Sequence, residues 1–325
     1  MKKLAALLVL PLCAFASTEE KIDRVLSCQP GGTLRVDVGF GSIQVVGEPS
    51  RTEVGVYVWR RTTRRSQSAE EEYLRTNPVE IVQDGNNVTV RAKTKSNFSW
   101  NWFGLWSNRN EANYMIKVPE HFLAQLNTSG GSIEVTLLDG SVKADTSGGS
   151  LKFTTIHGNL RGDTSGGSIT VNECEGDINV DTSGGGIHVS GGKGTFKGDT
   201  SGGGISVKDF GGPISVDTSG GSISIENVRG RVVGSTSGGS VRGVFPEPLT
   251  DSVDLSTSGG SVTVKIAANA AFNLDAETSG GSVNTDLPVT VQGKVERSEL
   301  HGTVNGGGPR LKLRSSGGSI HVQKL

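Results

Sequence analysis

One eight-residue stretch decides the fold of this chain: Gly162-Asp163-Thr164-Ser165-Gly166-Gly167-Ser168-Ile169. Its Thr-Ser-Gly-Gly core recurs six times at a spacing of 18 residues and then twice at a spacing of 21. The copies start at Thr128, Thr146, Thr164, Thr182, Thr200, Thr218, Thr236, Thr257 and Thr278, and a last variant, Ser-Ser-Gly-Gly, starts at Ser315. A fixed period of this size is typical of solenoids, in which each unit buries its apolar face only against its neighbours.

Apolar residues occupy equivalent positions in successive repeats. One column contains Leu151, Ile169, Ile187, Ile205, Ile223 and Val241, and another contains Val142, Leu160, Ile178, Phe196, Ile214 and Val232. Alternate residues in each segment are apolar, which is the periodicity of a strand. Each repeat is therefore predicted to form two short strands joined by Ser-Gly-Gly, with the paired glycines supplying positive φ at the bend.

Two architectures fit this alternation: a β-solenoid with one coil per repeat, and an antiparallel meander with a hairpin at each Gly-Gly. We favour the solenoid because a coil must keep its residue count for its columns to stack, whereas hairpin loops vary in length. The two 21-residue units are then coils with three-residue bulges, one at Pro246 to Pro248 and one near Ala267 to Ala270.

The amino-acid composition indicates a folded chain but does not indicate a binding partner. Of the 48 glycines, 8 lie in residues 1–126 and 40 in the rest, so we divide the exported chain into residues 17–127 and a repeat region, 128–325. Lys and Arg number 32 against 33 Asp and Glu, so there is no overall basic field of the kind that attracts nucleic acid.

The first 16 residues have the pattern of a signal peptide. Lys2 and Lys3 precede an apolar run, residues 4–15, and Ala14-Phe15-Ala16 supplies small residues for cleavage before Ser17. A lipoprotein acylated at Cys13 is the weaker alternative, because the preceding Leu12 is bulky. No segment is long and apolar enough to predict a transmembrane span. We therefore expect an exported protein of the periplasm, cell surface or medium.

Residues 17–127 depart from the repeat. We predict a strand at residues 54–58, a capping box of Ser68 and Glu71 that opens a short helix through Leu74, and a hairpin turning at residues 84–87. Since residues 41–45 already look like a coil, we interpret the region as irregular first coils that carry an insertion and cap the open end of the solenoid.

The repeats and the lead-in around Gly31-Gly32 and Gly41-Ser42-Ile43 resemble the bacterial putative-adhesin family of unknown function. The resemblance covers essentially the whole exported chain. It implies an all-β, right-handed parallel β-helix in the cell envelope, and it transfers no catalytic residue.

Acidic residues form the most regular polar column, two residues before each Ser-Gly-Gly bend. They are Asp145, Asp163, Asp181, Asp199 and Asp217, with Lys143, Arg161 and Lys197 two residues before three of them. Carboxylates stacked about 4.8 Å apart could bind cations or mimic a glycosidase pair, but catalysis needs two acids in different environments. We predict a structural ladder of ion pairs, with no metal ion or cofactor.

We predict structural rather than catalytic or metal-binding roles for the serine, histidine and cysteine residues. The recurring Asp-Thr-Ser-Gly-Gly is a turn rather than a serine nucleophile, because such a nucleophile needs one oriented base. The histidines lack the spacing of metal ligands. We predict that Cys174 is buried and inert, with a bridge between Cys28 and Cys174 as the alternative.

One aromatic stretch stands apart from the repeats, at residues 98–106. Its candidate binding residues are Trp100, Trp102, Phe103 and Trp106. These rings could stack on sugars, enter a lipid interface or anchor a protein partner, or they could plug the solenoid end. We expect a non-enzymatic, adhesin-like scaffold or binding protein. The partner would be envelope polysaccharide, a lipid surface or another envelope protein. The alternatives are a carbohydrate-active β-helix enzyme and an envelope sensor of membrane-active ligands.

Overall fold

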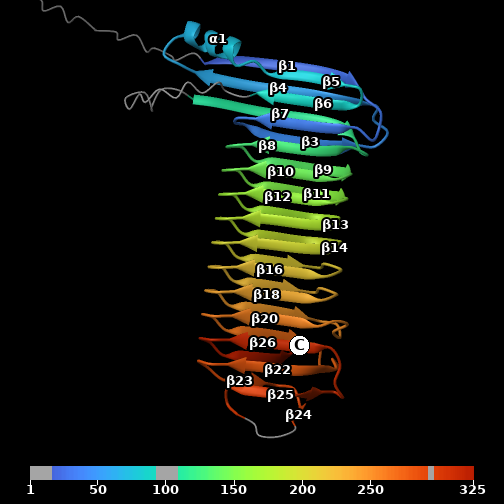
Figure 1. The fold of residues 1–325 in the computed structure, drawn as a ribbon, viewed down its shortest axis with the longest axis vertical. Helices are drawn as coiled ribbons and strands as arrows, with labels where there is room; N and C mark the ends of the chain where they lie inside the picture. Colours follow the sequence, from blue (N-terminus) through green and yellow to red (C-terminus); the bar gives the residue numbers. More distant parts are fainter. Residues whose placement is uncertain (1–16, 93–108, 292–295) are drawn as a thin grey trace, which may run out of the picture.

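A computed structural model describes residues 17–92, 109–291 and 296–325 of the chain. The described residues form a long rod of stacked coils, with one helix, α1 (Gln67–Thr76), at one end (Figure 1). Two walls of strands, which we call the first and second stacks, run along the rod. In the described part of the chain, no helix is long and apolar enough to cross a membrane.

The first stack holds one strand from each coil. Its spatial order is β5 (Glu80–Asp84), β6 (Asn87–Ala92), β2 (Thr33–Val38), β8 (Leu123–Thr128), β10 (Val142–Thr146), β12 (Leu160–Thr164), the second halves of β13 (Ile169–Thr182) and β14 (Ile187–Thr200), β16 (Ile214–Thr218), β18 (Val232–Thr236), β20 (Val253–Thr257), β26 (Arg310–Ser315), β22 (Phe272–Thr278), β25 (Glu299–Val304) and β24 (Val289–Thr290).

The second stack runs beside it. Its order is β1 (Thr18–Ser27), β4 (Glu53–Thr63), β7 (Arg109–Pro119), β3 (Ser42–Glu48), β9 (Ile133–Asp139), β11 (Leu151–His157), the first halves of β13 and β14, β15 (Ile205–Lys208), β17 (Ile223–Glu226), β19 (Val241–Phe245), β21 (Val262–Ile266), β27 (Ile320–Lys324) and β23 (Val283–Thr285).

The register confirms the solenoid and rules out the meander for the 18-residue repeats. Ile169 pairs in parallel with Ile187, which pairs with Ile205, and Ile205 pairs with Ile223. All four side chains are buried, and the column continues in both directions. The core is thus a narrow filling between the two stacks, built from equivalent apolar residues that lie on top of one another.

The Gly-Gly corner is built differently from the prediction. No glycine of the repeated Ser-Gly-Gly corners has positive φ; the positive values lie at the opposite corner, for example at Gly176 and Glu173. Glycine is needed at the first corner for close approach, because a Cβ on Gly167 would lie 2.0 Å from the carbonyl oxygen of Gly149 in the preceding coil. The prediction of positive φ was therefore wrong, although the need for glycine was real.

The Thr of each repeat joins neighbouring coils. Thr164 is buried, and its Oγ1 donates to the carbonyl oxygen of Gly149 at 2.8 Å and accepts from the Gly167 amide at 3.3 Å. Equivalent hydroxyls repeat this pattern along the corner. Each Thr therefore satisfies backbone groups of two successive coils inside the core.

The end of the rod near α1 differs from the repeats in strand direction. β4 pairs antiparallel with both β1 and β7, and β5 and β6 form the predicted hairpin, with Asp84 opposite Asn87. The predicted capping box was wrong by two residues. The N-cap is Ser66, whose hydroxyl accepts from the Ala69 amide, and the helix continues to Thr76.

The other end contains a coil that is out of sequence order. β26 lies between β20 and β22, and β27 lies between β21 and β23. The copy at Ser315 therefore follows the copy at Thr257 in space, and the copy at Thr278 lies beyond it. The first predicted bulge is confirmed by the 21-residue register of β18 and β20. The second was wrong, because the chain passes near Ala267 to Ala270 into β22, which pairs with β26 and not with β20, and so skips one level of the first stack instead of bulging.

Candidate functional site

The outer face of the first stack carries the predicted charge ladder. Lys143 lies 3.4 Å from Asp145, Arg161 lies 2.9 Å from Asp163, and Lys197 lies 3.1 Å from Asp199. These nitrogen to oxygen distances confirm the pairing between columns. In the described residues, no three His, Cys, Asp or Glu side chains are grouped to hold a metal ion.

Two of the five carboxylates of the ladder, Asp181 and Asp217, lack a base at the usual position. Asn179 stands two residues before Asp181, where its neighbours have Arg161 and Lys197. Burial raises the pKa of the Asp181 carboxyl, and the adjacent carboxylates of Asp199 and Asp163 raise it further. The charged form of Asp181 is thus disfavoured in the folded rod.

Beside this ladder runs a shallow depression that we call the long groove. It consists of two hollows of about 360 and 390 Å³, whose lining residues occupy equivalent positions in successive coils from β8 to β18. Its polar lining includes Lys143, Asn159, Arg161, Asp177 and Lys197. The coils therefore carry two hollows along one side of the rod, with amide side chains in the first and an ion-paired base in each.

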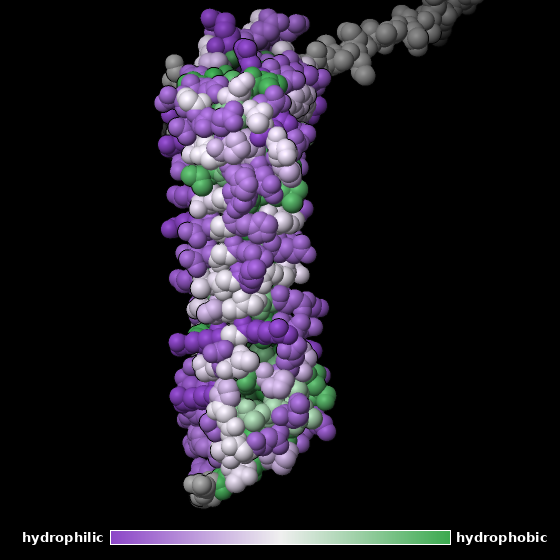
Figure 2. Space-filling view, turned by 90° about the vertical axis from the view of Figure 1, so that its right-hand side faces the viewer, coloured by the Kyte–Doolittle hydropathy of each residue, from purple (hydrophilic) through white to green (hydrophobic). Residues whose placement is uncertain are grey.

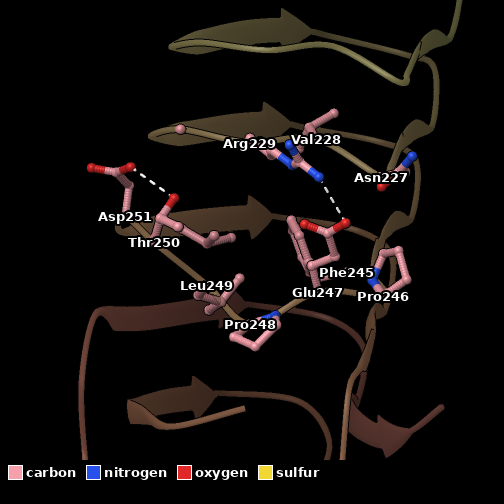
Figure 3. Close-up of a pocket in the computed structure, with 12 residues that line it drawn as sticks. Asn227, Val228, Arg229, Phe245, Pro246, Glu247, Pro248, Leu249, Thr250 and Asp251 are labelled. Carbon is pink, nitrogen blue, oxygen red and sulfur yellow. Dashed lines mark hydrogen bonds and ion pairs between the residues drawn. The ribbon is translucent and has the colours of Figure 1, made fainter. Parts of the chain in front are cut away.

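A separate pocket, outside the long groove, lies where the first 21-residue unit departs from the 18-residue repeat. This insertion pocket has a volume of about 270 Å³. Figure 3 shows Arg229 and Glu247, which are 2.7 Å apart, on one side, and Thr250 and Asp251 on the other. The buried ring of Phe245 contributes to its lining. The extra residues thus form a wall that the 18-residue coils lack.

The aromatic candidates are not among these residues. Trp100, Trp102, Phe103 and Trp106 lie outside the described residues, so their proposed binding role stays a prediction. Sequence reasoning missed the insertion pocket as a site, although the change in spacing from 18 to 21 marked its position. It also missed the fourth tryptophan, Trp59, which lies half-buried on the outer side of β4.

The two described cysteines are buried in the fold, and two histidines lie beside carboxylates. Cys28 and Cys174 are both buried and free, and burial raises the pKa of Cys174 to about 11. His121 Nδ1 lies 2.7 Å from Asp139, and His301 Nδ1 lies 3.0 Å from Asp275.

Asp275 is the centre of the ion pairs at the out-of-order coil. Burial raises the pKa of its carboxyl, but hydrogen bonds from Arg310 and Arg314 of β26 outweigh burial, and the net pKa is lowered. Since Asp275 belongs to β22, these bonds join the two strands whose order the sequence did not predict.

The stacked coils and glycine corners define the class of protein: an all-β solenoid rod. The chain belongs to the Toastrack DUF4097 family, whose model matches residues 56–323. This confirms the resemblance to a family without an established function.

Solved structures from three bacteria are similar at low identity. A putative cell adhesion protein from Clostridium sporogenes is 15% identical, with a TM-score of 0.24 over 94% of this chain and 100% of that one. A putative adhesin from Parabacteroides distasonis is 13% identical (TM-score 0.38, 94% and 97% covered), and one from Bacteroides fragilis is also 13% identical (0.32, 94% and 97%). No curated protein matches the sequence.

Proposed function

We propose that this protein is an exported, non-enzymatic binding scaffold of the cell envelope, adhesin-like in action. The long groove is the observation that carries the proposal. Lining residues recur along it at equivalent positions, at the coil spacing of about 4.8 Å, so an extended ligand would meet a contact at each step although the side chains differ. This geometry suits attachment along a length better than one reaction at one point.

The proposed export rests on the N-terminal sequence. Cleavage before Ser17 would leave β1 intact, because that strand begins at Thr18. In an exported rod, the groove would face the polysaccharides, lipids and proteins of the envelope.

Envelope polysaccharide is the ligand that the groove suits best. Its lining combines amide groups, such as those of Asn159 and Asn179, with bases such as Arg161 that already pair with a carboxylate. Such a surface offers hydrogen bonds to hydroxyl groups without a net field for a strongly charged polymer. A lipid surface would instead require a broad apolar face. Figure 2 shows one side of the rod, where polar side chains dominate and the apolar areas are small and separate.

The test is retention of the chain from Ser17 on immobilised envelope polysaccharide. We expect the triple variant Lys143→Ala, Arg161→Ala, Lys197→Ala to lose about tenfold or more in retention, as for several central contacts of an interface. The matched control removes three bases that also have acidic partners but do not line the groove: Lys152→Ala, Lys193→Ala, Lys208→Ala.

Three results would contradict the proposal. The first is equal retention of both triple variants, the second is binding to lipid vesicles alone, and the third is release of sugar from the polysaccharide by the purified chain. The last result would support the carbohydrate-active enzyme instead.

A further inference from the structure

A small hollow with aromatic and amide walls lies near the end of the rod that carries α1. It has a volume of about 330 Å³, and its walls include the rings of Phe40 and Trp59 and the side chains of Asn110, Glu111 and Asn113. These residues come from separate parts of the sequence. Asn113 brings them together, because it pairs with Ser42 on one side and with Trp59 on the other.

Glycines of the corner also line this hollow, together with Ser42 and Ala112. A Cβ on Gly130 would meet nothing within 4 Å, whereas a Cβ on Gly41 or Gly131 would lie 2.7 or 1.9 Å from a backbone oxygen. The corner is therefore open to a ligand at Gly130, where the backbone carries no side chain.

Neighbouring contacts hold the walls in place. Asn110 Oδ1 accepts hydrogen bonds from Thr62 Oγ1 and from an Arg64 guanidinium nitrogen, both at 2.9 Å, which fixes the orientation of the amide. Arg61 pairs with Glu111 at 2.7 Å and lies 5.6 Å from the centre of the Trp59 ring. The site therefore requires little ordering when a ligand binds.

We propose that this hollow, which we call the aromatic hollow, binds one sugar unit of a neutral glycan. A pyranose has an apolar face of C–H groups, which packs on an aromatic ring, and a rim of hydroxyls, which bond to planar amide and carboxylate groups. The hollow offers both kinds of wall within one volume. The residues that line the hollow include no Lys or Arg, and its carboxylate, Glu111, is already paired with Arg61, so nothing in these walls attracts an anionic ligand and the neutral class fits better.

This inference rests on the proposed binding of envelope polysaccharide and adds a second contact, separate from the long groove. The groove follows the first stack, whereas Trp59 and Asn113 belong to strands of the second. A glycan held at both places would gain avidity from two linked contacts.

The experiment is calorimetric titration of the chain from Ser17 with neutral hexasaccharides of glucose, mannose, galactose and N-acetylglucosamine. Trp59→Ala and Asn113→Ala should each weaken binding of the recognised sugar about tenfold or more, as expected of central contacts. Trp59→Phe should recover much of the loss, because it restores a ring. Tyr57→Ala is the control: Tyr57 lies two residues away on the same side of β4, is 38% exposed and does not line the hollow. It should change affinity less than about twofold.

Thermal melting of each variant separates binding from folding. If Trp59→Ala unfolds, Asn113→Ala and Trp59→Phe still decide the question. Failure of every hexasaccharide to bind, or equal loss in Tyr57→Ala and Asn113→Ala, would overturn the inference. Retention on envelope polysaccharide that depends on Lys143, Arg161 and Lys197 would leave the proposed function standing in that case.

Discussion

Replacing Gly167 by Ala should separate two coils of the rod. The new Cβ would lie 2.0 Å from the carbonyl oxygen of Gly149, whereas an ordinary contact of this kind is at least 3.4 Å. The difference, 3.4 − 2.0 = 1.4 Å, is more than a quarter of the coil spacing of about 4.8 Å. Both atoms belong to backbone or are fixed directly to it, so no flexible side chain can absorb the displacement.

The cost follows from two effects. Forcing extra volume into a packed interior costs about 1–3 kcal/mol. The same movement would stretch the bond from Thr164 Oγ1 to the Gly149 carbonyl, now 2.8 Å, and leave a buried polar group without its partner for a further ~1–3 kcal/mol. We therefore expect Gly167→Ala to lower the free energy of unfolding by about 2–6 kcal/mol.

The adjacent residue supplies the control. A Cβ on Gly166 would lie 3.6 Å from its nearest neighbour, so Gly166→Ala should be neutral or raise stability by up to about 1 kcal/mol through the unfolded state. Urea unfolding followed by circular dichroism measures both variants, with midpoint and slope compared because long repeat arrays need not unfold in one step. Equal effects of the two substitutions would refute the argument from close approach.

Three further predictions concern titratable groups. Asp181→Asn should raise the melting temperature at pH 7, because burial and the neighbouring carboxylates raise the pKa of Asp181, so that its charge opposes folding. The gain in melting temperature should shrink as the pH falls through the pKa that Asp181 has in the folded state. An equal gain at pH 7 and pH 4 would contradict this prediction. Glu70 is a buried residue of α1, and the hydrogen bond that its carboxylate accepts from the Thr18 hydroxyl lowers its pKa. The charge of Glu70 therefore stabilises the fold above its ordinary pKa of 4.5, and this stability is lost as the pH falls through the lower pKa of the folded state. Glu70→Gln should speed amide hydrogen exchange in α1 and β1 at pH 7, and unchanged exchange would count against this prediction. Cys28 and Cys174 should react with a thiol reagent only after unfolding, so rapid labelling of the native chain would show that their burial is misjudged.

The repetitive part of the fold was predictable because its constraints repeat. When residues such as Ile169 and Ile187 recur at constant spacing with apolar alternation, one register places them all in the core. The ion pairs followed in the same way, since Lys143 and Asp145 share one face of a strand.

Features that depend on which segments meet were not predictable. The copies at Thr257, Thr278 and Ser315 have nearly the same sequence, so nothing local says that the last copy lies between the other two. Either positive φ or close approach can require glycine at a corner, and the sequence cannot distinguish the two causes. The aromatic hollow joins Phe40 and Trp59 to residues about 50 positions or more further along the chain.

The order of strands at the two ends offers a physical reason for these departures. A solenoid of parallel coils leaves open edges that can pair with other chains. At one end β1 is outermost in the second stack, and five of its ten residues are charged. At the other, the outermost strands are β24 and β23, which have only two and three residues. The coil formed by β26 and β27 has partners on both sides, so it cannot fray without breaking two interfaces. The non-repetitive segments therefore occupy the exposed ends, where charge and short length oppose edge pairing, and the regular coils lie between them.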